Sequence, residues 1–206
     1  MPELLMPLLA ALAYGVAAYL LATGLRRNDA ERKLPHWLLL PALTLHATTH
    51  IAGWVRLEGP DLHFFAALSL VGLGMAALTT LAARSQRVQA LGVVVYPIAA
   101  LMLLLYHFYG HGRPKVMDWP LQLHAWLALM AYATLAIATL LALMLLLQER
   151  ALRRHRVDSG LLRALPPLTL TESLLFRLIA VGFVLLTLTL VTGVLFVEDL
   201  MAQHLA

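Results

Sequence analysis

Residues 121–147, LQLHAWLALMAYATLAIATLLALMLLL, decide the class of fold. This stretch contains no Asp, Glu, Lys or Arg, and it is longer than the roughly 20 apolar residues that cross about 30 Å of hydrocarbon. Backbone N–H and C=O groups find no water in lipid, so the stretch is predicted to be a helix. As a continuous helix it would be roughly 40 Å long, and we expect it to tilt or to project from the bilayer.

Five further stretches are similarly apolar, and the segments between them are short. The chain is 61% hydrophobic and 13% charged, with a mean hydropathy of +0.81, which excludes a water-soluble domain. We therefore predict an all-α polytopic transmembrane bundle of about six spans, forming a single domain over residues 1–206. The predicted spans are Leu4–Leu25, Leu38–Val55, Phe64–Ala83, Leu91–Phe108, Leu121–Leu147 and Leu174–Phe196.

The basic residues are unevenly distributed along the chain. Most of the 15 Lys and Arg residues fall in or just beyond the first, third and fifth connections, and only Arg56, Arg113 and Lys115 fall in the others. Basic loops stay cytoplasmic, so we predict that both termini lie on the outer, periplasmic side. The basic residues behind the net charge of +4 lie mostly in these loops. We therefore expect membrane lipids as partners and no nucleic acid.

Two absences narrow the chemistry. The sequence has no Cys, which excludes disulfides, thiolate metal sites and covalent haem attachment through C-x-x-C-H. It also has no hydrolase, zincin, Walker or dinucleotide-binding motif. We therefore predict no catalytic residue and do not favour an enzyme.

The nine histidines concentrate in the predicted outer half of the bundle. His46 and His50 are four residues apart in the second stretch, so they project from one face of a helix. Ionisable residues at membrane depth are costly, and they usually face the bundle interior, paired or bound to a ligand. The alternative interpretation is that His46 simply forms a hydrogen bond with a neighbouring helix.

Imidazole binds iron, copper and zinc, and haem iron takes it as an axial ligand. In a chain without Cys, a b-type haem held by two histidines from different helices is the simplest cofactor to predict. Both ligands must lie at the same depth in the bilayer, which favours His50 or His107 as the partner of His124. A zinc site remains an alternative. Its ligands would be His107, His111, His124 and Asp118.

Several short strings occur in an order that is typical of one family. Towards the C-terminus they are Pro166–Pro167, Glu172, Leu175–Phe176–Arg177, Gly182–Phe183, Leu186–Thr187–Leu188, Leu190 and Gly193. Earlier in the chain they are Leu45–His46–Ala47, Ala67–Leu68–Ser69–Leu70–Val71, Leu123–His124 and Ala131–Tyr132. Through these strings the chain resembles the cytochrome c assembly and HemX-like membrane family, in particular its YpjD-like inner-membrane branch, over nearly its whole length.

The resemblance implies a multi-pass protein of the bacterial inner membrane that handles haem at the outer face, with cytochrome assembly components as partners. It implies that His46 and His124 match the family's intramembrane histidines, whereas the depth argument favours His50. We favour His46 and His124, because a tilted or broken second helix would remove a difference of one turn. The connection from Tyr109 to Pro120 lacks the tryptophan-rich motif of members that attach haem to cytochrome c, which argues against synthetase activity. Members usually continue with a His–Lys pair and about two more spans, so we expect this sequence to be either a fragment or a shortened form that lacks one ligand.

The leading hypothesis is therefore a membrane protein that binds or handles haem for cytochrome assembly, through His46, His124 and His50. One alternative is a transporter or divalent-metal homeostasis protein that uses a histidine cluster including His107 and His111. Another is a structural subunit without a cofactor.

Overall fold

A computed structural model describes residues 2–26, 36–82, 89–110, 117–153 and 167–196. The described part of the chain folds into six helices and contains no strand, which confirms the all-α prediction. The helices are α1 (Pro2–Arg26), α2 (His36–Leu57), α3 (Phe64–Ala82), α5 (Gly92–Tyr109), α6 (Trp119–Arg153) and α8 (Leu168–Phe196).

Each of these helices overlaps one of the apolar stretches, and five of them are long and apolar enough to cross a membrane. The exception among the described helices is α2, whose residues include His46, His50 and Arg56. The apolar spans bear out a multi-pass membrane protein. The exact number of spans and the side on which the termini lie stay predictions.

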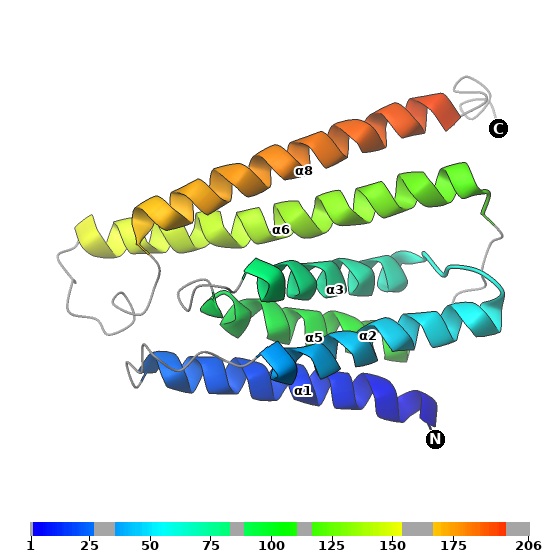
Figure 1. Ribbon diagram of the computed structural model, residues 1–206, viewed down its shortest axis with the longest axis horizontal. Coiled ribbons are helices and arrows are strands. Elements are labelled where there is room, and N and C mark those ends of the chain that lie inside the picture. Colours follow the sequence, from blue (N-terminus) through cyan, green and yellow to red (C-terminus); the bar gives the residue numbers. More distant parts are fainter. Residues whose placement is uncertain (1, 27–35, 83–88, 111–116, 154–166, 197–206) are drawn as a thin grey trace.

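The helices run alternately up and down, and four of them form a compact group (Figure 1). α1 packs against α2 and α5, and α3 packs against α2 and α5, so that each helix of the group touches two others. α6 packs on the outside of α3, and α8 packs against α6. The start of α1 and the end of α8 lie at the same end of the bundle, which we call the N-terminal end (Figure 1). α2 and α5 also finish there, and α3 and α6 begin there.

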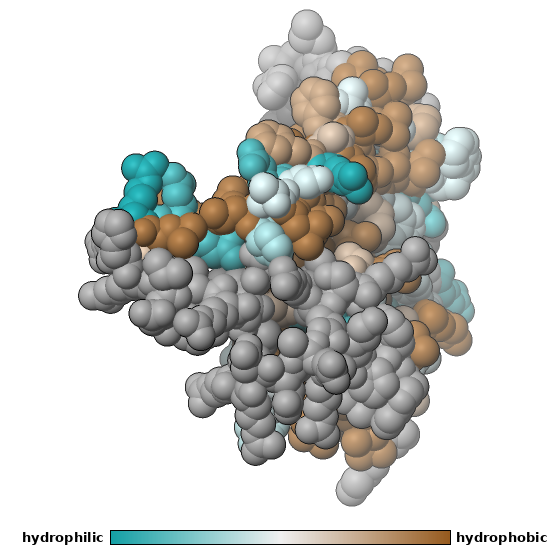
Figure 2. Space-filling view, turned by 60° about the vertical axis from the view of Figure 1, so that its left-hand side comes forward, coloured by the Kyte–Doolittle hydropathy of each residue, from teal (hydrophilic) through white to brown (hydrophobic). Residues whose placement is uncertain are grey.

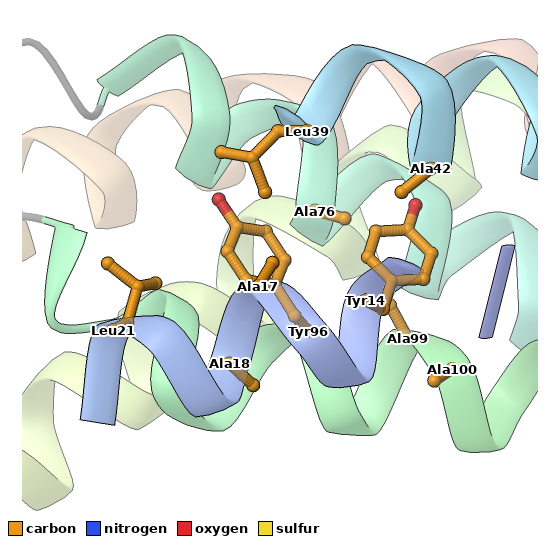
Figure 3. Packing of buried hydrophobic residues seen from close by; sticks show 10 residues of the cluster. All are labelled: Tyr14, Ala17, Ala18, Leu21, Leu39, Ala42, Ala76, Tyr96, Ala99 and Ala100. Carbon is orange, nitrogen blue, oxygen red and sulfur yellow. The ribbon is translucent and has the colours of Figure 1, made fainter. Parts of the chain in front are cut away.

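Small side chains allow the four helices to approach closely. Around Tyr14 of α1 and Tyr96 of α5, the buried cluster consists largely of alanines (Figure 3). The two tyrosine rings stack with their centroids 5.9 Å apart. Membrane helices associate through such small residues because lipid tails leave little hydrophobic driving force between them. Away from these contacts, α1, α6 and α8 each expose many large apolar residues. Hydrophobic residues, in brown, cover much of the coloured part of the surface in Figure 2.

The contact between α3 and α6 joins the outer helix pair to the group of four. A Cβ atom built on Gly74 would lie 2.9 Å from the Cβ of Ala133, so these helices meet at a position where only glycine fits without a shift. α6 has 35 residues and would measure about 52 Å as a regular helix, well over the thickness of the hydrocarbon core. Its last residues are charged, and Glu149 and Arg153 form an exposed ion pair there.

Replacement of Gly74 by alanine should therefore lower the free energy of unfolding by about 1–3 kcal/mol, the usual cost of overpacking. Gly15→Ala is the matched control, because a Cβ at Gly15 would meet nothing within 4 Å and the substitution also lies inside a helix. Thermal unfolding of both variants in the same detergent measures the difference. Equal stability of the two variants would contradict the close approach of α3 to α6.

Candidate functional site

Three ring side chains follow one another along the face of α2 that points into the bundle. His46, His50 and Trp54 are spaced four residues apart, so they lie one above the other. The ring centroids of the two histidines are 5.7 Å apart, and those of His50 and Trp54 are 6.1 Å apart. His46 is 0% exposed and His50 1% exposed, so both imidazoles lie inside the helix group, as the sequence predicted for ionisable residues at this depth.

The hydroxyl of Ser69 on α3 joins the two histidines. Its Oγ lies 3.0 Å from Nε2 of His46 and 2.9 Å from Nε2 of His50, and the serine is itself fully buried. The other ring nitrogen of His46, Nδ1, lies 3.3 Å from the hydroxyl of Tyr14 on α1. Both nitrogens of His46 are therefore in hydrogen bonds, so the alternative in which His46 bonds neighbouring helices describes its surroundings correctly.

A second group of rings surrounds Tyr106 at the N-terminal end of the bundle. The Tyr106 ring stacks on His50 with centroids 4.5 Å apart and lies 5.9 Å from the ring of His63. His63 Nδ1 is 2.6 Å from a carboxylate oxygen of the buried Asp61, so the imidazole donates its proton to that oxygen. Gly53 leaves room for this packing, because a Cβ there would lie 3.1 Å from the Tyr106 hydroxyl.

Three buried ring nitrogens in this region have no hydrogen-bond partner within the described part of the chain. They are Nδ1 of His50, Nε1 of Trp54 and Nε2 of His63. A buried polar atom without a partner usually costs about 1–3 kcal/mol, and it calls for an explanation such as a bound ligand. Among the described residues, the N-terminal end of the bundle thus gathers three buried ring nitrogens that are free to bond a ligand.

His124 lies at the same end, on α6. Its Nδ1 is 3.3 Å from the hydroxyl of Thr192 on α8, and its ring is partly exposed. A Cβ at Gly193 would lie 3.1 Å from the His124 ring, so the glycine makes space for the imidazole. Trp126 lies two residues further along α6. It contacts Trp54 of α2 edge to face, with the ring centroids 5.4 Å apart. The two tryptophans therefore connect the α2 histidines with the helix that carries His124.

The predicted site residues do not all converge. The structure brings His46 and His50 together, whereas His124 contacts Thr192 and no described contact joins it to either of them. His107 packs on its neighbour Phe108, and His111 lies outside the described residues. No group of three or more His, Asp or Glu residues suited to a metal ion occurs in the described segments.

Sequence reasoning missed the partners of the histidines: Tyr14, Ser69, Tyr106 and the Asp61–His63 pair. Ser69 and Tyr14 each carried a signal, since each is a polar residue inside an apolar stretch. Nothing in the sequence indicated that both point at the same imidazole, because that depends on which helices are neighbours.

The site is therefore a buried polar cluster within a multi-pass helical membrane protein, with its open positions at one end of the bundle. A model of the family described as cytochrome C assembly protein matches residues 61–206. The inner membrane protein YpjD of Escherichia coli K12 is 32% identical over 205 residues, which cover 96% of this chain and 76% of that protein. The YpjD proteins of strains O6:H1 and O157:H7 match to the same extent. No solved structure gives a significant match.

The chain belongs to the cytochrome c assembly protein family, as the resemblance predicted. It is similar to an inner membrane protein over most of its length, and its apolar helices agree with a multi-pass location in that membrane.

Loss of the Ser69 hydroxyl should destabilise the protein, because Ser69→Ala leaves two buried imidazole nitrogens without their partner. We expect a loss of about 1–3 kcal/mol in the free energy of unfolding. Thr79→Val is the control on the same helix, since the buried Thr79 hydroxyl has no hydrogen bond in the described structure and should be removable at little cost. If both variants unfolded at the wild-type temperature, the hydrogen bonds of Ser69 would contribute nothing.

Proposed function

We propose that this protein handles haem during cytochrome assembly, and that the haem is held at the N-terminal end of the bundle with His124 as an iron ligand. Membership of the cytochrome c assembly family supports the haem-handling role. The distribution of arginines supports placing this end on the periplasmic side. Haem is then the cargo of the protein, with its iron held by imidazole until it is passed on.

The observation that carries the assignment is the environment of His124. Histidines that bind a metal through one ring nitrogen usually hold the other in a hydrogen bond, which fixes the ring and its tautomer. His124 has this arrangement, because Nδ1 faces the hydroxyl of Thr192 while Nε2 has no hydrogen bond in the described part of the structure. The ring is also partly exposed, so it is accessible to a large planar ligand from the lipid or the periplasm.

The two histidines of α2 differ in their suitability as ligands. His46 would have to give up its hydrogen bond to Tyr14 or to Ser69 before it could bind iron. His50 keeps one ring nitrogen without a partner, and it lies closer to the N-terminal end. We therefore favour His50 over His46 as the α2 residue that contacts the haem. The depth argument favoured the same residue, there as the second iron ligand.

Replacement of His124 by alanine should weaken haem binding at least about tenfold, because it removes a ligand of the iron. His107→Ala is the matched control, since His107 lies at the same end of the bundle but has no ring contact or hydrogen bond in the described structure apart from the packing of its ring on Phe108. Haem titration followed through the Soret band, with iron and zinc determined by elemental analysis, tests the assignment. Equal haem affinity in the two variants, or stoichiometric zinc without iron, would overturn it.

The hydroxyl of Thr192 should also contribute, because it orients the imidazole. Thr192→Val keeps the shape of the side chain but removes the acceptor, and we expect about a tenfold loss of haem affinity. Thr187→Val is the control. Thr187 is exposed on the same helix and bonds only the carbonyl of Phe183. Unchanged haem binding by Thr192→Val would mean that the contact with His124 has no role in ligation.

A further inference from the structure

An unbroken chain of hydrogen bonds runs through the centre of the four-helix group. It starts at the hydroxyl of Tyr14, passes through His46 and Ser69, and ends at His50. The donor–acceptor distances are 3.3, 3.0 and 2.9 Å. Beyond the last link, Nδ1 of His50 is buried and has no partner in the described residues.

The single hydroxyl hydrogen of Ser69 forces the two histidines into opposite tautomers. A neutral imidazole carries one N–H and one bare nitrogen, and a serine hydroxyl donates only one hydrogen bond. If both histidines donated to Ser69, its own buried hydrogen would have no acceptor among the described contacts. If both had a bare Nε2, one of them would lack a donor. Each case costs about 1–3 kcal/mol, so one histidine donates to Ser69 and the other accepts from it.

Tyr14 sets the direction of the chain. Within the described structure its hydroxyl has one hydrogen-bond partner, Nδ1 of His46. If His46 donated from Nδ1, the phenolic hydrogen of Tyr14 would be left without an acceptor. Tyr14 therefore donates to His46, His46 donates from Nε2 to Ser69, and Ser69 donates to Nε2 of His50. This order leaves His50 with its proton on Nδ1.

His50 thus presents a buried N–H at the N-terminal end, and Trp54 presents another. The indole nitrogen is always a donor, and it too has no partner among the described residues. The two side chains are one helical turn apart on the same face of α2, with ring centroids separated by 6.1 Å. Buried donors that lack acceptors fit a ligand that brings oxygen atoms.

We propose that His50 and Trp54 form a two-donor site for a carboxylate of a porphyrin, and that the chain through Tyr14, His46 and Ser69 keeps His50 in the donating tautomer. The proposal rests on the proposed function only in naming a porphyrin as the bearer of the carboxylate. The neighbouring Asp61 accepts from His63 through Oδ1, and no hydrogen bond joins it to either of these two donors in the described residues. His50 then serves the ligand as a hydrogen-bond donor, whereas His124 serves it as a metal ligand.

The direction of the chain is tested without any porphyrin. We expect ¹⁵N NMR of histidine-labelled protein in lipid nanodiscs to show opposite tautomers for His46 and His50, with the proton of His50 on Nδ1. Tyr14→Phe should change the tautomer populations of His50 although the two residues are not in contact. In a Ser69→Ala background, Tyr14→Phe should no longer affect His50. Identical tautomers, or a bare Nδ1 on His50 in the wild type, would overturn the proposal.

The ligand class is tested with iron-free protoporphyrin IX and its dimethyl ester. Trp54→Phe keeps a ring but removes the donor, and we expect it to weaken binding of the acid about tenfold while binding of the ester changes little. Trp126→Phe is the control, because its ring touches Trp54 but its nitrogen is not among the buried unpaired atoms. Equal effects on acid and ester, or no effect on either, would overturn the carboxylate site. Since these probes lack iron, the outcome is independent of whether His124 binds haem.

Discussion

The hydrogen bonds between the Ser69 hydroxyl and the imidazoles of His46 and His50 are the interaction on which the rest of the site depends. In lipid, a polar group without a hydrogen-bond partner in the protein finds no water to bond instead. One buried serine therefore fixes two rings on α2 and holds that helix against α3. This contact matters because α2 is the one described helix that is not among the candidate membrane spans, and it packs only lightly on α3.

The same constraint explains why the remaining open positions gather at one end of the bundle. Towards the centre, Tyr14 and Ser69 use both nitrogens of His46, and the neighbouring cluster consists largely of buried alanines. Towards the N-terminal end, aromatic rings replace the alanines, with Tyr106 stacked on His50 and Trp126 packed edge to face on Trp54. These ring contacts supply no hydrogen bond, so Nδ1 of His50 and Nε1 of Trp54 stay without a partner in the described residues.

Hydropathy and spacing were enough to predict the helices and the shared face of His46 and His50, because both follow from the chain's local geometry. The partners of these histidines could not be predicted in this way. They depend on α1 and α3 being the neighbours of α2, and no local pattern in the sequence indicates which helices are neighbours. The expectation that His46 and His124 act together shows this limit of sequence-based prediction most clearly. Both lie in apolar stretches, yet His46 is enclosed by the four-helix group and His124 faces α8.

The division between the four-helix group and the α6–α8 pair runs through the proposed site. A ligand bound by His124 on α6 and by His50 and Trp54 on α2 would touch both parts, which otherwise meet at this end through the Trp54–Trp126 contact. Further along α3, the close approach of Gly74 to Ala133 holds the four-helix group against α6. In the proposed haem complex, the hydrogen-bonded His50 and the partly exposed His124 would thus be carried by different helices, one inside the four-helix group and one outside it.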